Sequence, residues 1–333
     1  MAQLQGLSIA YLNVTDKCLA ALNDLVWLDR LNLRHTAISN NAIVELVNAN
    51  SHTLRRLNIS NTVVNDKALA NFPNSSQLLD LSLNDTGITD AGCEHVTRCS
   101  WLTDLRLDLT DVTDDGIRYL ANCEHLKNLE LFQTNVTDTS LVWLSDSSIE
   151  HLGLGYTSLT DAGMPALTEF SSLRSLDLQS TALGDKGLRF LAEASLLNRL
   201  YLENTKITNS GIQFLLKLPL ESLSLNRVLD DGGLKVLSRH ATLQRLAIWA
   251  AKVTSWQPLS LLERLQVLLI DDAVEDLSPL QSLRQLKVLL LWGNNFSPTQ
   301  LAKLRIGLPK CQIKHFKPHK KPIDEFRSLC RYA

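Results

Sequence analysis

The sequence predicts an α/β solenoid of about thirteen repeats, with parallel strands on a concave face and helices on a convex face. Leucine supplies 69 of the 333 residues, whereas aromatic residues supply only 6%. The pattern L-x-x-L-x-L, with isoleucine at one of its positions in five copies, recurs at intervals of 21 to 26 residues, which indicates one packing unit used many times. The copies begin at Leu4, Leu28, Leu54, Leu78, Leu102, Leu126, Ile149, Leu173, Leu197, Leu220, Leu243, Leu265 and Leu286.

Each copy of the pattern predicts a short strand. In the copy that begins at Leu102, Leu105 and Leu107 lie two residues apart and therefore point to the same side of a strand. One repeat can bury this leucine face only if another repeat stacks on it, so the strands should pair in parallel along the solenoid. Because nothing interrupts the pattern, we expect one solenoid domain over residues 1–313.

A second phrase follows the strand in the middle repeats, as in Thr110-Asp-Val-Thr113-Asp114-Asp-Gly116. The hydroxyl of the first threonine should satisfy backbone groups where the chain turns. The Thr-Asp pair should cap a helix on the convex face and place a negative charge in its first turn. The first threonine recurs in eight successive repeats, at Thr36, Thr62, Thr86, Thr110, Thr134, Thr157, Thr181 and Thr205.

The last repeats and the two ends differ from the middle. Pro258 and Pro279 stand where a helix would run, so these segments should be 3₁₀ or extended. Residues 298–313 predict a closing cap, with a helix, a proline stop and a final strand. The first strand has no cap before it, so its edge at residues 7–12 could be a dimer contact, a site that the tail covers or a truncation point. A homodimer through this uncapped first repeat is therefore one of the expected arrangements.

These motifs resemble those of the leucine-rich-repeat family over more than nine-tenths of the chain. The phrase Thr-Asp-x-Gly before Leu-x-x-Leu is similar to the cysteine-containing, ribonuclease-inhibitor-like subclass, as are Cys99 and Cys123, which lie 24 residues apart. Threonine stands after the strand where that subclass usually has cysteine or asparagine. The resemblance implies a binding scaffold.

The C-terminal tail, residues 314–333, leaves the repeat pattern and is basic. Residues 310–333 hold seven Lys or Arg against two Asp or Glu, whereas the whole chain has a net charge of −2. Two interpretations are open: a solvated tail, or a strap anchored by Phe316 and Phe326 that an acidic body attracts. Such a strap could cover the apolar part of the concave face.

Composition excludes several function classes. A net charge of −2 does not supply the positive charge that nucleic-acid binding requires, and no apolar run is long enough to span a membrane. The N-terminus lacks the features of a signal peptide, so the six cysteines predict reduced thiols in a cytoplasmic protein, or in host-cell cytosol if the chain is a secreted effector. Cys311, His315 and His319 are metal-ligand types, but Pro318 disrupts their spacing. We find no nucleophile, base or phosphate loop, and expect no cofactor, no metal and no enzyme.

Outward strand residues do not determine the fold, so their chemistry is free to serve binding. They predict a polar and basic N-terminal zone, a central zone of acids, aromatics and arginines, and an apolar C-terminal zone. We expect a partner protein to bind this concave face without catalysis. The alternative is a substrate-recognition subunit of a ubiquitin-ligase complex or a bacterial effector acting on host signalling. The expected partner-binding residues are Arg106, Asp108, Glu130, Phe132, Tyr156, Arg199, Tyr201, Glu203, Trp249 and Trp292.

Overall fold

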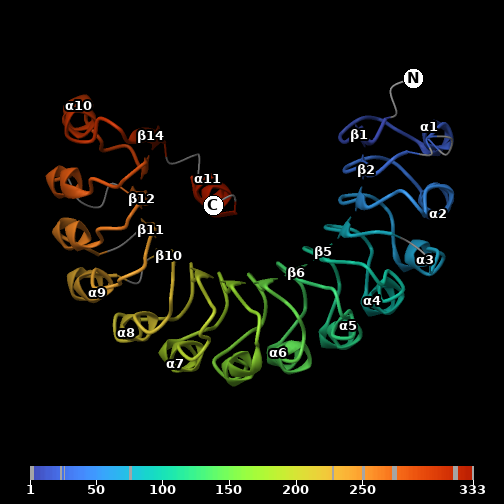
Figure 1. Cartoon of the computed structure of the whole chain (residues 1–333), viewed down its shortest axis with the longest axis horizontal. Helices are drawn as coiled ribbons and strands as arrows, with labels where there is room; N and C mark the ends of the chain where they lie inside the picture. Colours follow the sequence, from blue (N-terminus) through green and yellow to red (C-terminus); the bar gives the residue numbers. More distant parts are fainter. Residues whose placement is uncertain are drawn as a thin grey trace. The chain divides into compact units, whose positions relative to one another are not determined.

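The computed structural model describes residues 4–22, 25, 27–74, 77–226, 229–249, 252–271, 276–317 and 322–331. The chain forms two compact units, Met1–Leu173 and Arg174–Ala333. In each unit parallel strands alternate with helices that lie along one side of the strands (Figure 1). We call the other side the strand face; it is the face that the sequence predicts to be concave.

The first unit contains seven described strands. They are β1 (Gly6–Ser8), β2 (Arg30–Asn32), β3 (Arg56–Asn58), β4 (Asp80–Ser82), β5 (Asp104–Arg106), β6 (Asn128–Glu130) and β7 (His151–Gly153). The helices between them are α1 (Asp16–Ala20), α2 (Asn40–Ala49), α3 (Asp66–Leu69), α4 (Asp90–Val96), α5 (Asp114–Leu120) and α6 (Asp138–Leu144), followed by the 3₁₀ helix η1 (Met164–Glu169).

The second unit repeats this order over its described residues. Its strands are β8 (Ser175–Asp177), β9 (Arg199–Tyr201), β10 (Ser222–Asn226), β11 (Arg245–Trp249), β12 (Val267–Asp271), β13 (Val288–Trp292) and β14 (Gln312–Phe316). Its helical segments are α7 (Asp185–Leu191), α8 (Ile212–Leu215), α9 (Asp231–Leu237), η2 (Gln257–Leu261), η3 (Ser278–Ser282), α10 (Pro298–Gly307) and α11 (Ile323–Arg331).

Strand register places equivalent leucines side by side. Leu105 of β5 pairs with Leu129 of β6, and Leu246 of β11 pairs with Leu268 of β12. These leucines are fully buried on the side of the strands that faces the helices. Alternate strand residues point to the strand face, as the period of two predicts.

The threonine ladder is confirmed in all eight repeats. Thr110 is buried, and its hydroxyl donates to the Leu107 carbonyl at 2.6 Å. Each hydroxyl thus satisfies the carbonyl three residues earlier, where the chain leaves the strand and turns. The same bond is made by Thr36, Thr62, Thr86, Thr134, Thr157, Thr181 and Thr205.

The phrase Thr-Asp-x-Gly joins neighbouring repeats as well as capping helices. Thr113 accepts from the Asp115 amide as the cap of α5, which confirms the predicted cap, and its own amide and hydroxyl donate to Asp90 of the preceding repeat at 2.8 and 2.7 Å. A Cβ on Gly116 would lie 2.5 Å from Oδ1 of Asp90. Glycine therefore leaves room for the aspartate of the preceding repeat. The sequence predicted the cap and did not predict this link.

A proline lies in the first turn of each of the three described 3₁₀ segments. Pro258 lies in η2 and Pro279 in η3, as predicted. The phrase that ends at Gly163 was expected to open an α-helix, but Pro165 lies at the start of η1, which is 3₁₀. Proline is tolerated in the first turn of a helix, where its missing amide hydrogen has no helical acceptor, so these prolines mark the 3₁₀ segments without excluding an α-helix: α10 begins with Pro298 and is α-helical.

The closing segment follows the prediction and then extends beyond it. Ser297 caps α10: its hydroxyl accepts from the Gln300 amide, and its own amide donates to the Gln300 side chain. Strand β14 follows. Strand β14 continues to Phe316, so the first residues of the predicted tail belong to the sheet. At the other end, Leu7 and Ile9 are half-buried, whereas Leu12 is exposed. A dimer contact through this edge stays a prediction.

Candidate binding surfaces

The strand face of Met1–Leu173 brings together five of the predicted partner-binding residues. Phe132 and Tyr156 are in contact, with ring centroids 4.8 Å apart and ring planes inclined by 52°. Tyr156 is 49% exposed. The Asp108 carboxylate accepts from the Phe132 amide at 2.9 Å, which fixes the backbone beneath the aromatic pair. This pair is an amphipathic platform of the kind that dominates protein interfaces.

Charged side chains flank the platform on β5 and β6. Arg106 donates to the Asp80 carboxylate at 2.7 Å and to the Ser82 hydroxyl at 3.0 Å. The Glu130 carboxylate lies against Gly153 of β7, where a Cβ would be only 1.8 Å from its Oε2. The absence of a Cβ at Gly153 therefore leaves room for the Glu130 side chain on the neighbouring strand.

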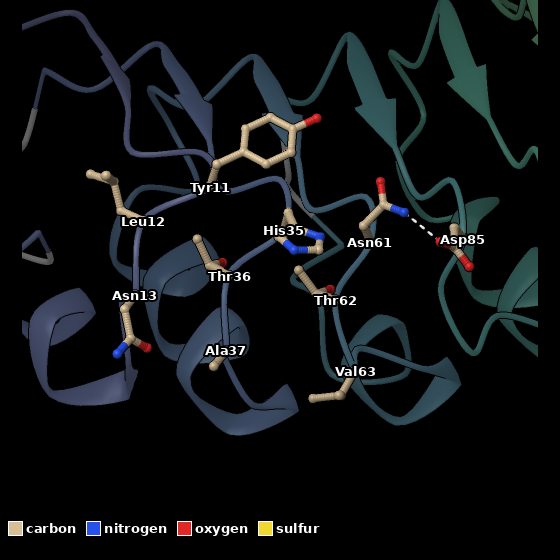
Figure 2. A pocket seen from close by; sticks show the side chains of 10 residues that line it. All are labelled: Tyr11, Leu12, Asn13, His35, Thr36, Ala37, Asn61, Thr62, Val63 and Asp85. Carbon is tan, nitrogen blue, oxygen red and sulfur yellow. Dashed lines mark hydrogen bonds between the residues drawn. The ribbon is translucent and has the colours of Figure 1, made fainter.

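A hollow of about 640 Å³ lies in the same unit, at the turns that follow the first strands (Figure 2). Tyr11, His35, Asn61 and Asp85 occupy equivalent turn positions with left-handed φ values of 60°, 56°, 56° and 52°. Two of these residues bind each other, since the Asn61 amide donates to Asp85, and Arg34 Nε donates to Asn61 at 3.0 Å. The residues that line the hollow are brought together by the turns of consecutive repeats.

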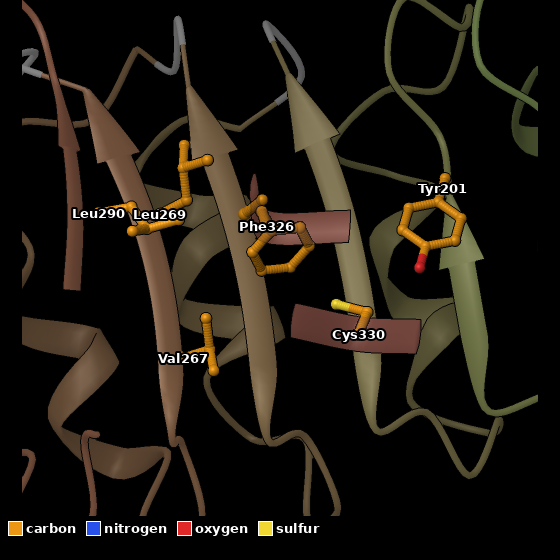
Figure 3. Packing of buried hydrophobic residues seen from close by; sticks show 7 residues of the cluster. Tyr201, Val267, Leu269, Leu290, Phe326 and Cys330 are labelled. Atoms are coloured by element: carbon orange, nitrogen blue, oxygen red, sulfur yellow. The ribbon is translucent and has the colours of Figure 1, made fainter. Parts of the chain in front are cut away.

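The strand face of Arg174–Ala333 is covered by α11. Phe326 and Cys330, one helical turn apart, are fully buried against β11–β13 (Figures 1 and 3). Of the two interpretations of the tail, the structure has the strap, with Phe326 as an anchor and Phe316 half-buried beside it. The buried residues beneath α11 are Tyr201, Ala247, Val267, Leu269 and Leu290.

Arg327 of α11 makes the polar contacts of this interface. Its Nη1 donates to the Asp177 carboxylate at 2.7 Å and its Nη2 to the Glu203 carboxylate at 3.0 Å. The guanidinium carbon lies 4.7 Å from the centre of the Tyr201 ring. Glu203 also accepts from the Ser224 hydroxyl at 2.8 Å. One cation therefore compensates two acids, one at the end of β8 and one just after β9.

Burial shifts the ionisation of these groups. It raises the pKa of Asp177 to about 6, against the opposing charge of Arg327. Burial also disfavours the charge on Arg327, but Asp177 and Glu203 outweigh it and hold the pKa of the guanidinium above its usual value. Arg327 is therefore charged at any pH at which the protein folds.

Two further contacts fix the ends of α11. Lys314 of β14 forms an ion pair with Glu325 in its first turn. The Cys330 sulfur lies 3.0 Å from the Ser222 hydroxyl, and burial raises the pKa of the Cys330 thiol. The first turn and the last are thus both held to the sheet.

The other five predicted residues lie in Arg174–Ala333, the unit that carries α11. Tyr201 and Glu203 are buried, at 7% and 3% exposure. Arg199, Trp249 and Trp292 are half-buried, and Trp249 packs against the cluster around Phe326. The sequence placed these residues on the correct face. Whether they contact a partner stays a prediction, because an intramolecular helix occupies their surface.

Sequence reasoning did not assign Asp177, Arg327 or Cys330 to a site. The signal available was the basic tail opposite an acidic body, together with the four-residue spacing of Phe326 and Cys330. Neither feature identifies which acids Arg327 meets, because the pairing joins residues 150 apart.

Searches for other chemistry gave negative results over the described ranges. Among those residues, no group of three or more His, Cys, Asp or Glu side chains is arranged to hold a metal ion; His319 lies outside them. No helix there has the length and hydropathy needed to cross a membrane. All six cysteines are described, and each is a free thiol.

Comparison with protein families identifies the repeat unit. The family described as "Leucine Rich repeat" matches residues 98–121 and 171–192. The chain has the leucine-rich-repeat fold. A comparison of the sequence with curated proteins gave no significant match.

Solved leucine-rich-repeat structures share this fold at low identity. An internalin of Listeria monocytogenes is 22% identical with a TM-score of 0.58, and the match covers 88% of this chain and 87% of the internalin. A leucine-rich-repeat protein of Leptospira interrogans is 17% identical with a TM-score of 0.52, over 93% and 90% of the two chains. A chain of the yeast Rad7–Elc1 complex is 20% identical with a TM-score of 0.55, over 76% and 71%.

Proposed function

We propose that this chain is a non-enzymatic protein-binding scaffold whose partner docks on the strand face of Met1–Leu173. The observation that carries the proposal is the contact between Phe132 and the exposed Tyr156. Two rigid rings supply a large apolar area at little conformational cost, and each has a polar or charged neighbour to set orientation.

The chemistry around the rings specifies the partner. Glu130 ends β6, Asp108 lies two residues after β5, and Arg106 is paired with Asp80. We expect the partner to present a basic segment with an apolar or aromatic side chain that packs on Tyr156. Acids around an aromatic centre select such a segment and speed its association.

The alternative roles would use the same surface. A substrate-recognition subunit of a ubiquitin ligase and an effector acting on host signalling both bind a protein, as Rad7 and Elc1 bind each other in the yeast complex. The free state of all six cysteines supports our proposal of a reducing, cytosolic compartment. The identity of the captured partner separates these roles.

The test is affinity capture from the source cells with the full chain, read by mass spectrometry. The wild-type chain is compared with a Phe132→Ala/Tyr156→Ala variant and with Tyr119→Ala, a control that removes an exposed tyrosine on the helix side. Equal thermal midpoints would establish that all three are folded. We expect one or more proteins to be retained by the wild type and the control and lost by the double variant. Identical protein sets from all three chains would refute the proposed surface.

A further inference from the structure

The helix α11 is attached to the outside of a core that is complete without it. The leucines that pack between the strands and the helices, such as Leu246, Leu268 and Leu289, are fully buried on the opposite side of the sheet. Helix α11 covers only the strand-face residues that alternate with them, among them Ala247 and Leu269. The helix can therefore leave without opening the core between strands and helices.

The surface beneath α11 combines an apolar area with two carboxylates, so it favours a ligand that is apolar and carries a cation. Its floor is apolar, formed by β11 to β13, and its wall carries Asp177, Glu203 and Tyr201. Two carboxylates at 18% and 4% side-chain exposure need a cation when a helix covers them. A planar guanidinium meets both acids and the tyrosine ring at once, which a lysine ammonium cannot do.

The fit of α11 to this surface is incomplete. Nε of Arg327 and Oε2 of Glu203 are buried, and each lacks a hydrogen-bond partner among the described residues. The helix has nine residues, fewer than a peptide needs to hold a helix alone in water. It therefore depends on the surface for its order, and a partner helix that donates to Oε2 of Glu203 would fit the surface better.

From these observations we infer that the strand face of Arg174–Ala333 is a receptor site for an amphipathic helix of a partner protein, and that α11 occupies it as an intramolecular competitor. The partner helix carries an aromatic residue, an arginine directly after it and a small apolar residue one turn on, as Phe326, Arg327 and Cys330 do in α11. This site is separate from the Phe132–Tyr156 platform, and its test involves neither residue.

The competition is tested with a fluorescent synthetic peptide of residues 322–333 under reducing conditions, measured by anisotropy. The receptor is the full chain, either unchanged or with Phe326→Ala/Arg327→Ala to weaken its own helix. We expect the double variant to bind the peptide at least tenfold more tightly than the wild type, because a tethered helix competes at millimolar effective concentration. A chain with Ser328→Ala, an exposed position of the same helix, should behave as the wild type.

Two controls test whether the site recognises the arginine through its two carboxylates. A peptide with Arg327→Ala should bind the double variant at least tenfold more weakly, and adding Asp177→Asn and Glu203→Gln to the receptor should remove that difference. A folded double variant that does not bind the native peptide would overturn the inference. Binding that occurs only together with dimer formation in size-exclusion chromatography would assign the site to a second copy and equally overturn it.

The unmodified chain provides an independent measurement. Excess native peptide should accelerate hydrogen exchange of the amides at 323–331 and leave the amides of β12 protected. Unchanged exchange of α11 at saturating peptide would show that α11 is a permanent part of the fold, contrary to the inference.

Discussion

Arg327 and Asp177 form an ion pair across 150 residues of sequence, with Nη1 2.7 Å from the Asp177 carboxylate. The pair joins the last helix to the first strand of Arg174–Ala333, and both side chains are largely buried. Removing either partner therefore leaves the other charge largely buried without its counterion.

Replacing Arg327 with leucine should detach α11. Asp177 and Glu203 would be left without a cation beneath a hydrophobic helix, at a cost of about 3 kcal/mol if the helix stayed in place. Hydrogen exchange of the amides at 323–331 should therefore accelerate strongly. Arg305→Leu, on the exposed side of α10, should leave that exchange unchanged. Adding Asp177→Asn and Glu203→Gln should restore part of the protection; full protection in Arg327→Leu alone would contradict the assigned role of the pair.

Gly116→Ala should destabilise Met1–Leu173. The new Cβ would lie 2.5 Å from Oδ1 of Asp90 and would displace the carboxylate that binds Thr113, at a cost of about 1–3 kcal/mol. Gly116→Ser should cost less, because Ser140 holds the equivalent position and donates to Asp114. Urea unfolding measures both, with Asp115→Ala as the exposed control on the same helix. If serine proved no better than alanine, the interlocking role of this position would be wrong.

Thr110→Val should cost about 1–2 kcal/mol in the free energy of unfolding. Valine fills the same volume but leaves the buried Leu107 carbonyl without the hydroxyl that donates to it at 2.6 Å. The matched control is Thr97→Val, where an exposed hydroxyl donates to the Glu94 carbonyl at 2.6 Å and water can replace it. Equal costs at the two positions would show that burial does not set the value of this bond.

His240 should make the protein sensitive to mild acid. Burial lowers the pKa of its imidazole in the folded chain, although the Leu215 carbonyl, 3.2 Å from Nε2, opposes the shift. A group whose folded pKa is depressed stabilises the fold above its unfolded pKa, near 6.5, and this stabilisation is lost as the pH falls through the folded value. Between pH 7.5 and 5, urea unfolding should show a larger loss of stability for the wild type than for His240→Gln. Asp177 is present in both proteins, so a parallel loss would exclude His240 as the cause.

Most of the repeat architecture could be predicted from the sequence because its contacts are local or between neighbouring repeats. Leu105 pairs with Leu129 of the next repeat, and the Thr110 hydroxyl donates to a carbonyl three residues before it. The hydrogen bond from Thr113 to Asp90 was not predicted from the sequence, because the helix cap alone accounts for the Thr-Asp pattern. The 3₁₀ segment η1 was not predicted, although the proline in its first turn, Pro165, stands in the sequence.

The candidate sites divide in the same way. Phe132 and Tyr156 occupy known positions of adjacent repeats, so the register alone places them side by side. Tyr201, Glu203 and Trp249 were assigned to the correct face, but the register does not reveal what covers that face. The sequence by itself determined the repeat, its direction and its outward columns, because each depends on neighbours within about 25 residues. Only the tertiary structure decided that α11 lies on one of those columns: a nine-residue helix has no stable structure of its own, and the acids that hold Arg327 are 124 and 150 residues away.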